Sequence, residues 1–178
     1  TIVVPEDRTD VEVRVEISNP GPAPSVGFSY WAHQMLTMGL KPGKGGEPQP
    51  AIPQIFMQTN SGVTEAPATS VVWAKPNQPY LLGNESWERE GRNGTTTGDW
   101  IAQRNPLTGE TVLCQAETAV AQFYSWRDDL NKADLSLEWM FPYTTLEAGK
   151  GWNTRYVLRY LKSIAPKDLP SRLLPQVQ

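Results

Sequence analysis

Apolar and polar residues alternate along much of the chain with the two-residue period of β-strands. Residues 11–17 place Val and Ile at odd positions and Glu and Arg at even positions, which is typical of a strand with one buried face. In residues 152–161 the same period places Thr154, Tyr156 and Leu158 on one face, opposite Asn153, Arg155 and Arg159. Both segments therefore predict half-buried strands.

Turn-forming residues separate these and several further strand-like segments. Asn, Pro and Gly cluster at residues 18–22 and 105–109, where they favour tight turns. Residues 110–117 follow the second turn as the second arm of a hairpin. Residues 41–53 read as a Gly/Pro-rich loop, and only residues 127–133 resemble a helical turn. Further strands are expected at residues 26–38, 53–59, 70–74, 99–104, 119–126 and 135–141.

This pattern predicts an all-β protein, an antiparallel β-sandwich. We expect residues 1–164 to form a single sandwich domain and residues 165–178 a Pro-containing C-terminal tail. The chain starts at Thr1, within a strand-like segment, so we expect it to be a piece of a longer protein. Its partner at the exposed strand edges would be a missing N-terminal segment or, in a homodimer, a second copy.

The composition of the chain limits the classes of partner that it could bind. A net charge of −3 and a pI of about 5.2 argue against nucleic acid, because phosphate binding needs a basic surface. No stretch approaches the roughly 18 apolar residues of a membrane span, so we expect a soluble protein with no membrane partner; its compartment stays open. The single cysteine, Cys114, excludes an internal disulfide and is expected to be a small buried residue. With one His and one Cys far apart, no metal or other cofactor is predicted.

The single histidine, His33, is the first candidate for chemistry. Histidine has an unperturbed pKa near neutral, which suits proton transfer. It follows Tyr30 and Trp31, and aromatic faces pack well against the C–H faces of sugars. The alternative is a structural histidine among core aromatics.

The second candidate is Glu138, in the apolar segment 135–141. Alternation places Glu138 opposite Trp139 and its apolar neighbours. A carboxylate there is either exposed to solvent or held in a pocket, where burial raises a carboxyl pKa toward that of a general base. The sequence leaves both possibilities open.

A charged segment at residues 85–94 contains Trp87, Glu88 and Arg89. These residue types could bind the hydroxyl groups of a sugar. The segment could equally be a solvated loop.

Two stretches together resemble the galactose-mutarotase (aldose 1-epimerase) superfamily, in its C-terminal half. In the first, a strand ends at the turn of residues 18–22, and the next strand carries His33 in the position of the family's catalytic histidine. In the second, a Leu-Ser-Leu-Glu strand carries Glu138, followed by a Pro-containing loop with Tyr143 and a Tyr-rich strand. Ala32 replaces the family's Asn before the histidine, and the chain lacks the half that would supply a second histidine and an arginine.

The resemblance implies a β-sandwich that interconverts sugar anomers without a metal or a covalent intermediate. Glu138 would be the base that removes the proton of the anomeric hydroxyl, and His33 the acid that protonates the ring oxygen. We expect the two to lie on opposite sides of one sugar ring, with substrate-binding residues Trp31, Trp87, Glu88, Arg89, Trp139 and Tyr143. The ligand would be a sugar or an oligosaccharide. The alternatives are a non-catalytic carbohydrate-binding module and an accessory or interaction domain of a larger polysaccharide-processing protein.

Overall fold

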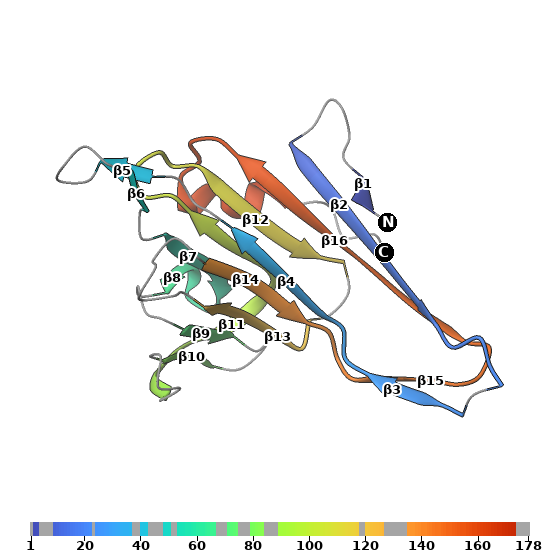
Figure 1. Ribbon diagram of the computed structural model, residues 1–178. Coiled ribbons are helices and arrows are strands. Elements are labelled where there is room, and N and C mark those ends of the chain that lie inside the picture. Colours follow the sequence, from blue (N-terminus) through green and yellow to red (C-terminus); the bar gives the residue numbers. More distant parts are fainter. Residues whose placement is uncertain are drawn as a thin grey trace.

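The computed structural model describes residues 2–3, 9–22, 24–36, 40–42, 48–50, 53–66, 71–74, 79–83, 89–117, 120–126 and 135–173. These residues form sixteen strands and one 3₁₀ helix, which Figure 1 shows in sequence colours. The strands are β1 (Ile2–Val3), β2 (Asp10–Ser18), β3 (Val26–Phe28), β4 (Trp31–Leu36), β5 (Leu40–Pro42), β6 (Pro48–Pro50), β7 (Gln54–Thr59), β8 (Gly62–Ala66), β9 (Val71–Ala74), β10 (Pro79–Gly83), β11 (Arg89–Arg104), β12 (Thr111–Ala116), β13 (Gln122–Trp126), β14 (Leu135–Met140), β15 (Thr144–Leu146) and β16 (Gly151–Leu161). The helix is η1 (Pro166–Arg172).

All described strand pairs are antiparallel, and most strands belong to one large sheet that folds into a sandwich. Along the sheet the order is β1-β2-β16-β12-β11-β10-β9-β13-β14-β4, with β7 and β8 branching from β11. The chain is therefore an all-β protein, as the hydrophobic alternation predicts.

The long strand β11 carries the sheet from one layer of the sandwich to the other. Its N-terminal part pairs with β10, and its C-terminal part pairs with β12 and β7. The register shifts between Thr96 and Ile101, and such irregularities let a strand bend between two sheets. Gly98 lies in this bend, where a Cβ atom would come within 2.7 Å of the Gln58 side chain. Only glycine allows so close an approach without a shift of the neighbouring side chain.

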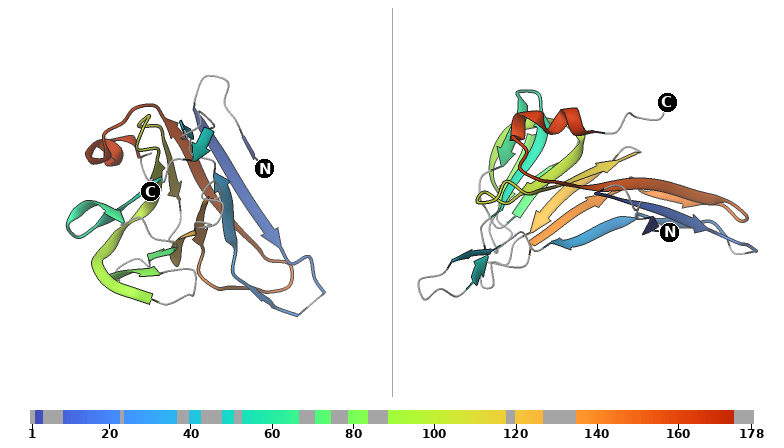
Figure 2. Two further views of the ribbon diagram at one scale, coloured as in Figure 1. Left: turned by 60° about the vertical axis from the view of Figure 1, so that its left-hand side comes forward. Right: turned by 90° about the horizontal axis from the view of Figure 1, so that it is seen from above.

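The main core lies between the two layers, which Figure 2 shows from two further directions. Ile101, Cys114 and Tyr156 come from β11, β12 and β16, and Leu137 and Trp139 from β14. All five are buried. Cys114 is thus a small buried core residue, as predicted, and burial raises the pKa of its thiol well above the ordinary value.

A buried polar contact joins the layers near the start of β14. Gln103 of β11 donates its amide N–H to the Ser136 carbonyl oxygen at 3.0 Å, and the Ser125 hydroxyl of β13 donates to the same oxygen at 2.9 Å. All three residues are buried. Two side chains from different strands therefore fix the backbone of β14 two residues before Glu138.

A second core cluster lies under helix η1. Leu169 of the helix is fully buried and packs with Phe56, Trp100 and Leu113. Arg159 of β16 adds a polar link, because its guanidinium donates to both carboxylate oxygens of Asp10 and to the Arg172 carbonyl oxygen. Residues 166–172 of the Pro-containing tail are thus packed on the sandwich.

Strands β3 and β15 pair with each other and form an arm that projects from the sandwich (Figure 1). Buried Asn19 holds the end of this arm that lies away from β4 and β14: its side-chain amide donates to the carbonyl oxygens of Pro24 and Leu146, and its carboxamide oxygen accepts from the Gly21 N–H. Asn19 thereby connects the turn after β2 to β15, far along the sequence.

Several elements differ from the expectations. Residues 26–38 contain two strands, β3 and β4, which belong to different sheets. Parts of the expected loop 41–53 are the paired strands β5 and β6, and β11 begins ten residues before the expected start at 99. Residues 127–133, expected to resemble a helical turn, lie outside the described residues. In the described part of the chain, no helix is long and apolar enough to cross a membrane.

Candidate functional site

The two candidate catalytic residues are direct neighbours on adjacent strands. Glu138 of β14 pairs with His33 of β4 in the antiparallel register, and on its other side it pairs with Tyr124 of β13. Paired residues in an antiparallel sheet project their side chains to the same face. The register therefore places His33, Glu138 and Tyr124 in one row across three strands.

The imidazole Nε2 of His33 lies 3.5 Å from the Glu138 carboxylate oxygen Oε1. This is an ion-pair distance when His33 is protonated, and it is longer than a hydrogen bond. The expectation that the two residues lie on opposite sides of a sugar ring is therefore wrong, because no ring fits between groups in direct contact. They form a side-by-side pair.

The pair is asymmetric in its access to solvent. The His33 side chain is 55% exposed, whereas that of Glu138 is 6% exposed. Glu138 is buried although it lies on the face opposite Trp139 and Leu137, which fill the core. Both faces of β14 are thus covered at this point, which answers the question that the sequence left open: the carboxylate is held in a buried environment.

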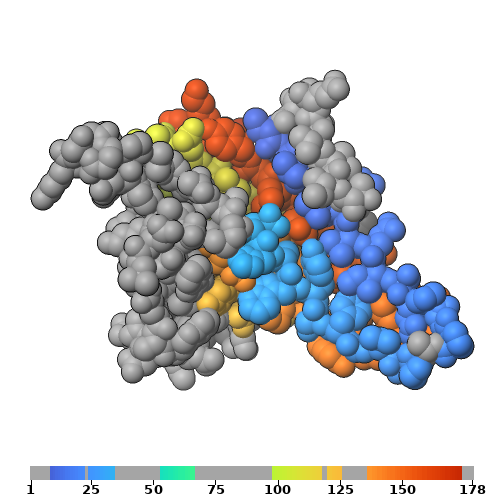
Figure 3. All heavy atoms as spheres, in the orientation of Figure 1, coloured from blue at the N-terminus to red at the C-terminus, as the bar shows by residue number. Residues whose placement is uncertain are grey.

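Two aromatic side chains lie near the pair on this face. Trp31, two residues before His33 on β4, meets the ring of Tyr124 edge-on, with the centroids 6.2 Å apart and the planes at 88°. Trp31 is 49% exposed and Tyr124 is 7% exposed. Burial, and secondarily the charge of Glu138, raise the pKa of Tyr124 to about 12. Figure 3 shows β4, in light blue, at the surface of this face.

Tyr124 is a member of this site that the sequence did not reveal. Alternation within residues 122–126 indicates which residues share a face, but it does not tell which strand lies beside β13. The register with β14 is a property of the folded sheet, and it alone brings Tyr124 next to Glu138.

Two of the remaining predicted binding residues, Trp139 and Tyr143, do not lie at the pair. Trp139 is fully buried and packs edge-on against Tyr156 in the core. Tyr143 is exposed near the projecting arm, where its hydroxyl lies directly over Gly27. Trp87 and Glu88 lie outside the described residues, and Arg89 is described only as the first residue of β11.

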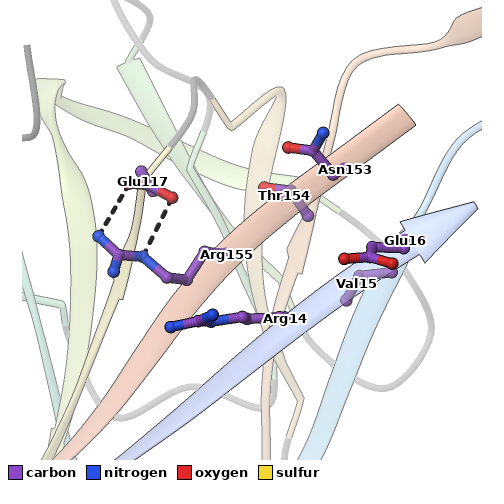
Figure 4. A pocket seen from close by; sticks show the side chains of 7 residues that line it. All are labelled: Arg14, Val15, Glu16, Glu117, Asn153, Thr154 and Arg155. Atoms are coloured by element: carbon purple, nitrogen blue, oxygen red, sulfur yellow. Dashed lines mark hydrogen bonds and ion pairs between the residues drawn. The ribbon is translucent and has the colours of Figure 1, made fainter. Parts of the chain in front are cut away.

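A small polar pocket of about 250 Å³ lies elsewhere, over β2 and β16 (Figure 4). Its two arginines, Arg14 and Arg155, pair in register. Arg155 binds Glu117 through two hydrogen bonds of 2.8 and 3.0 Å, and Arg14 binds Glu12. Carboxylates thus already compensate both guanidinium groups, so this pocket offers little net charge to a ligand.

Among the described residues, no group of three or more His, Cys, Asp or Glu side chains could hold a metal ion. What the site does contain is a buried carboxylate, an exposed imidazole and an exposed indole on one face. A carboxylate and an imidazole in contact can exchange protons with a ligand that reaches both.

No protein-family model matches the sequence, and no curated protein matches it significantly. Similar solved structures exist. A candidate aldose 1-epimerase from Escherichia coli K12 superposes with a TM-score of 0.53 at 12% identity, over 86% of this chain and 57% of that chain. A protein from Synechocystis sp. PCC 6803 gives the same TM-score and identity, over 86% of this chain and 51% of that one. A galactose mutarotase related enzyme from Lactobacillus acidophilus has a TM-score of 0.49 at 11% identity, over 87% and 58%.

These likenesses define the fold: the chain has an aldose 1-epimerase-like β-sandwich architecture. It spans between half and three-fifths of the length of these structures.

Proposed function

We propose that this chain carries the acid–base pair of a protein that interconverts the anomers of a sugar, in the manner of an aldose 1-epimerase. The observation that carries the proposal is the 3.5 Å contact between the His33 imidazole and the buried Glu138 carboxylate. Both residues also occupy the positions that the sequence resemblance assigns to the acid and the base.

The side-by-side arrangement suits this chemistry better than an arrangement across the ring. In a cyclic sugar the anomeric hydroxyl oxygen and the ring oxygen are bonded to the same carbon, C1. A base for one oxygen and an acid for the other must therefore converge on neighbouring atoms. Two groups 3.5 Å apart can each reach one of these oxygens at hydrogen-bond distance.

In the proposed reaction Glu138 starts ionised and His33 starts protonated. Glu138 takes the proton from the anomeric hydroxyl while His33 gives its proton to the ring oxygen. The bond between C1 and the ring oxygen breaks, and C1 becomes the carbon of an aldehyde. After rotation about the C1–C2 bond, the hydroxyl group formed from the ring oxygen attacks the other face of the aldehyde. This hydroxyl group returns its proton to His33, and Glu138 returns its proton to the carbonyl oxygen. Both side chains are then in their starting protonation states.

Burial of Glu138 serves this role because a carboxylate with little access to water is a stronger partner for a ligand hydroxyl than a solvated one. The half-exposed indole of Trp31 lies two residues along the same strand from His33. It offers an apolar wall against which the C–H face of a sugar can pack.

The experiment is NMR exchange spectroscopy on a panel of aldoses, which measures the rate of exchange between the two anomeric proton signals. We expect the protein to accelerate exchange for at least one sugar, and Glu138→Gln to abolish the acceleration. The matched control is Glu147→Gln, which removes an exposed carboxylate and should leave the rate unchanged. Equal rates for the protein and its Glu138→Gln variant would refute the assignment.

A second candidate is a carbohydrate-binding module without catalysis. An exposed tryptophan beside a buried carboxylate would suit binding without turnover. Saturable sugar binding with no acceleration of anomer exchange would favour this function.

A further inference from the structure

The contact between Trp31 and Tyr124 crosses a strand. Trp31 is on β4 and Tyr124 is on β13, and β14 lies between them. Strands two places apart in a sheet are separated by about 10 Å, yet the two ring centroids are only 6.2 Å apart. The two rings must therefore lean toward each other above β14.

The residues beneath the rings follow from the register. Tyr124 pairs with Glu138, and Trp31 pairs with Met140. The rings thus meet above the space between Glu138 and Met140. This space lies on the C-terminal side of Glu138 along β14. In the same row, the Glu138 side chain is 6% exposed and the His33 side chain is 55% exposed.

Tyr124 is suited to hold this arrangement. Its side chain is almost fully buried, whereas Trp31 is half exposed and needs a neighbour to fix its orientation. The phenol of Tyr124, whose pKa burial raises from 10.0 to about 12, is neutral in the physiological range. No second negative charge then develops beside Glu138.

We propose that Tyr124 is a positioning residue: its ring holds the Trp31 indole over β14, so that the two rings cover Glu138 and direct a ligand to approach along His33. The packing part of this inference concerns the folded chain alone. The part that concerns sugars rests on the proposed function.

Fluorine NMR tests the packing without any sugar. In protein labelled with 5-fluorotryptophan, the signal of Trp31 is assigned by its loss in Trp31→Phe. We expect Tyr124→Leu to move this signal and to increase its shift between H₂O and D₂O, which reports exposure to water. Tyr124→Phe keeps the ring and should leave the signal in place. An unmoved Trp31 signal in Tyr124→Leu would overturn the inference.

The reciprocal experiment avoids any loss of folding, because Trp31 is half exposed. In protein labelled with 3-fluorotyrosine, Trp31→Leu should increase the solvent isotope shift of the Tyr124 signal, which is assigned by its loss in Tyr124→Phe. An unchanged Tyr124 signal would show that Trp31 does not cover it, and would overturn the inference in the same way.

The effect on a ligand is read from KM and kcat in the anomer-exchange assay. An edge-on aromatic pair contributes an amount that corresponds to about a 2–10-fold change, so Tyr124→Leu should raise KM by about that factor with a smaller change in kcat. Tyr124→Phe should restore KM to within about twofold. Tyr160→Leu, at a tyrosine outside the site, is the matched control. An unchanged KM in Tyr124→Leu would contradict the ligand-directing role.

If no sugar is turned over by the unaltered protein, the proposed function fails, and the fluorine signals still decide whether Tyr124 holds Trp31.

Discussion

Truncating the buried leucine of helix η1 should destabilise the whole domain. Leu169 is 0% exposed and packs in the cluster that contains Phe56, Trp100 and Leu113. Leu169→Ala removes three carbon atoms, which at about 0.8 kcal/mol for each buried CH₂ gives about 2.4 kcal/mol. The cavity left beneath the helix adds to this amount. We therefore expect the free energy of unfolding to fall by about 3 kcal/mol.

The assay is urea unfolding followed by tryptophan fluorescence, to which Trp100 in the same cluster contributes. The matched control is Leu107→Ala in the turn before β12, where the leucine is 58% exposed. This change should cost less than about 0.5 kcal/mol. If Leu169→Ala behaves like Leu107→Ala, helix η1 does not pack on the sandwich in solution, and the described second cluster is refuted.

Three further predictions concern other parts of the fold. Asn19→Ala should cost about 2 kcal/mol, because it leaves the carbonyl oxygens of part-buried Pro24 and buried Leu146 without this donor; an unfolding midpoint equal to that of exposed Asn153→Ala would contradict this. Because the pKa of Tyr124 is raised from 10.0 to about 12, the unfolded chain loses this proton first, so stability should fall as pH rises from about 10 to 12. Tyr124→Phe should reduce that fall by at most about 2.7 kcal/mol, which is two pH units at about 1.36 kcal/mol each, and identical slopes for the two proteins would argue against it. Cys114, whose buried thiol has a raised pKa, should react with a disulfide reagent only as fast as the protein unfolds; rapid reaction of folded protein would show that the thiol is accessible.

The strands of the sandwich could be predicted wherever the two faces of a strand differ in polarity. Residues 11–17 and 152–161 have this property, and they form the paired strands β2 and β16. The first part of β11 could not be found in this way, because residues 89–98 combine charged residues, Gly and Thr with no alternation. Its strand conformation depends on pairing with β10, a tertiary contact.

The sequence indicated the two central residues of the candidate site but not their arrangement in space. His33 and Glu138 could be chosen because an imidazole and a carboxylate are rare in aromatic and apolar strands. Their contact depends on the register of β4 against β14, which no local pattern encodes. Tyr124 was missed for the same reason, and the side-by-side geometry became visible only in the folded sheet.

The most direct measurement of the proposed pair is a double-mutant comparison of anomer interconversion, followed by polarimetry. Residues that act on one substrate carbon as a unit have non-additive effects. We expect His33→Asn and Glu138→Gln each to lower kcat by about 10²–10⁴-fold, and the double variant to be no slower than the slower single variant. Single variants that retain the full rate, or two losses that multiply in the double variant, would contradict a side-by-side acid–base pair.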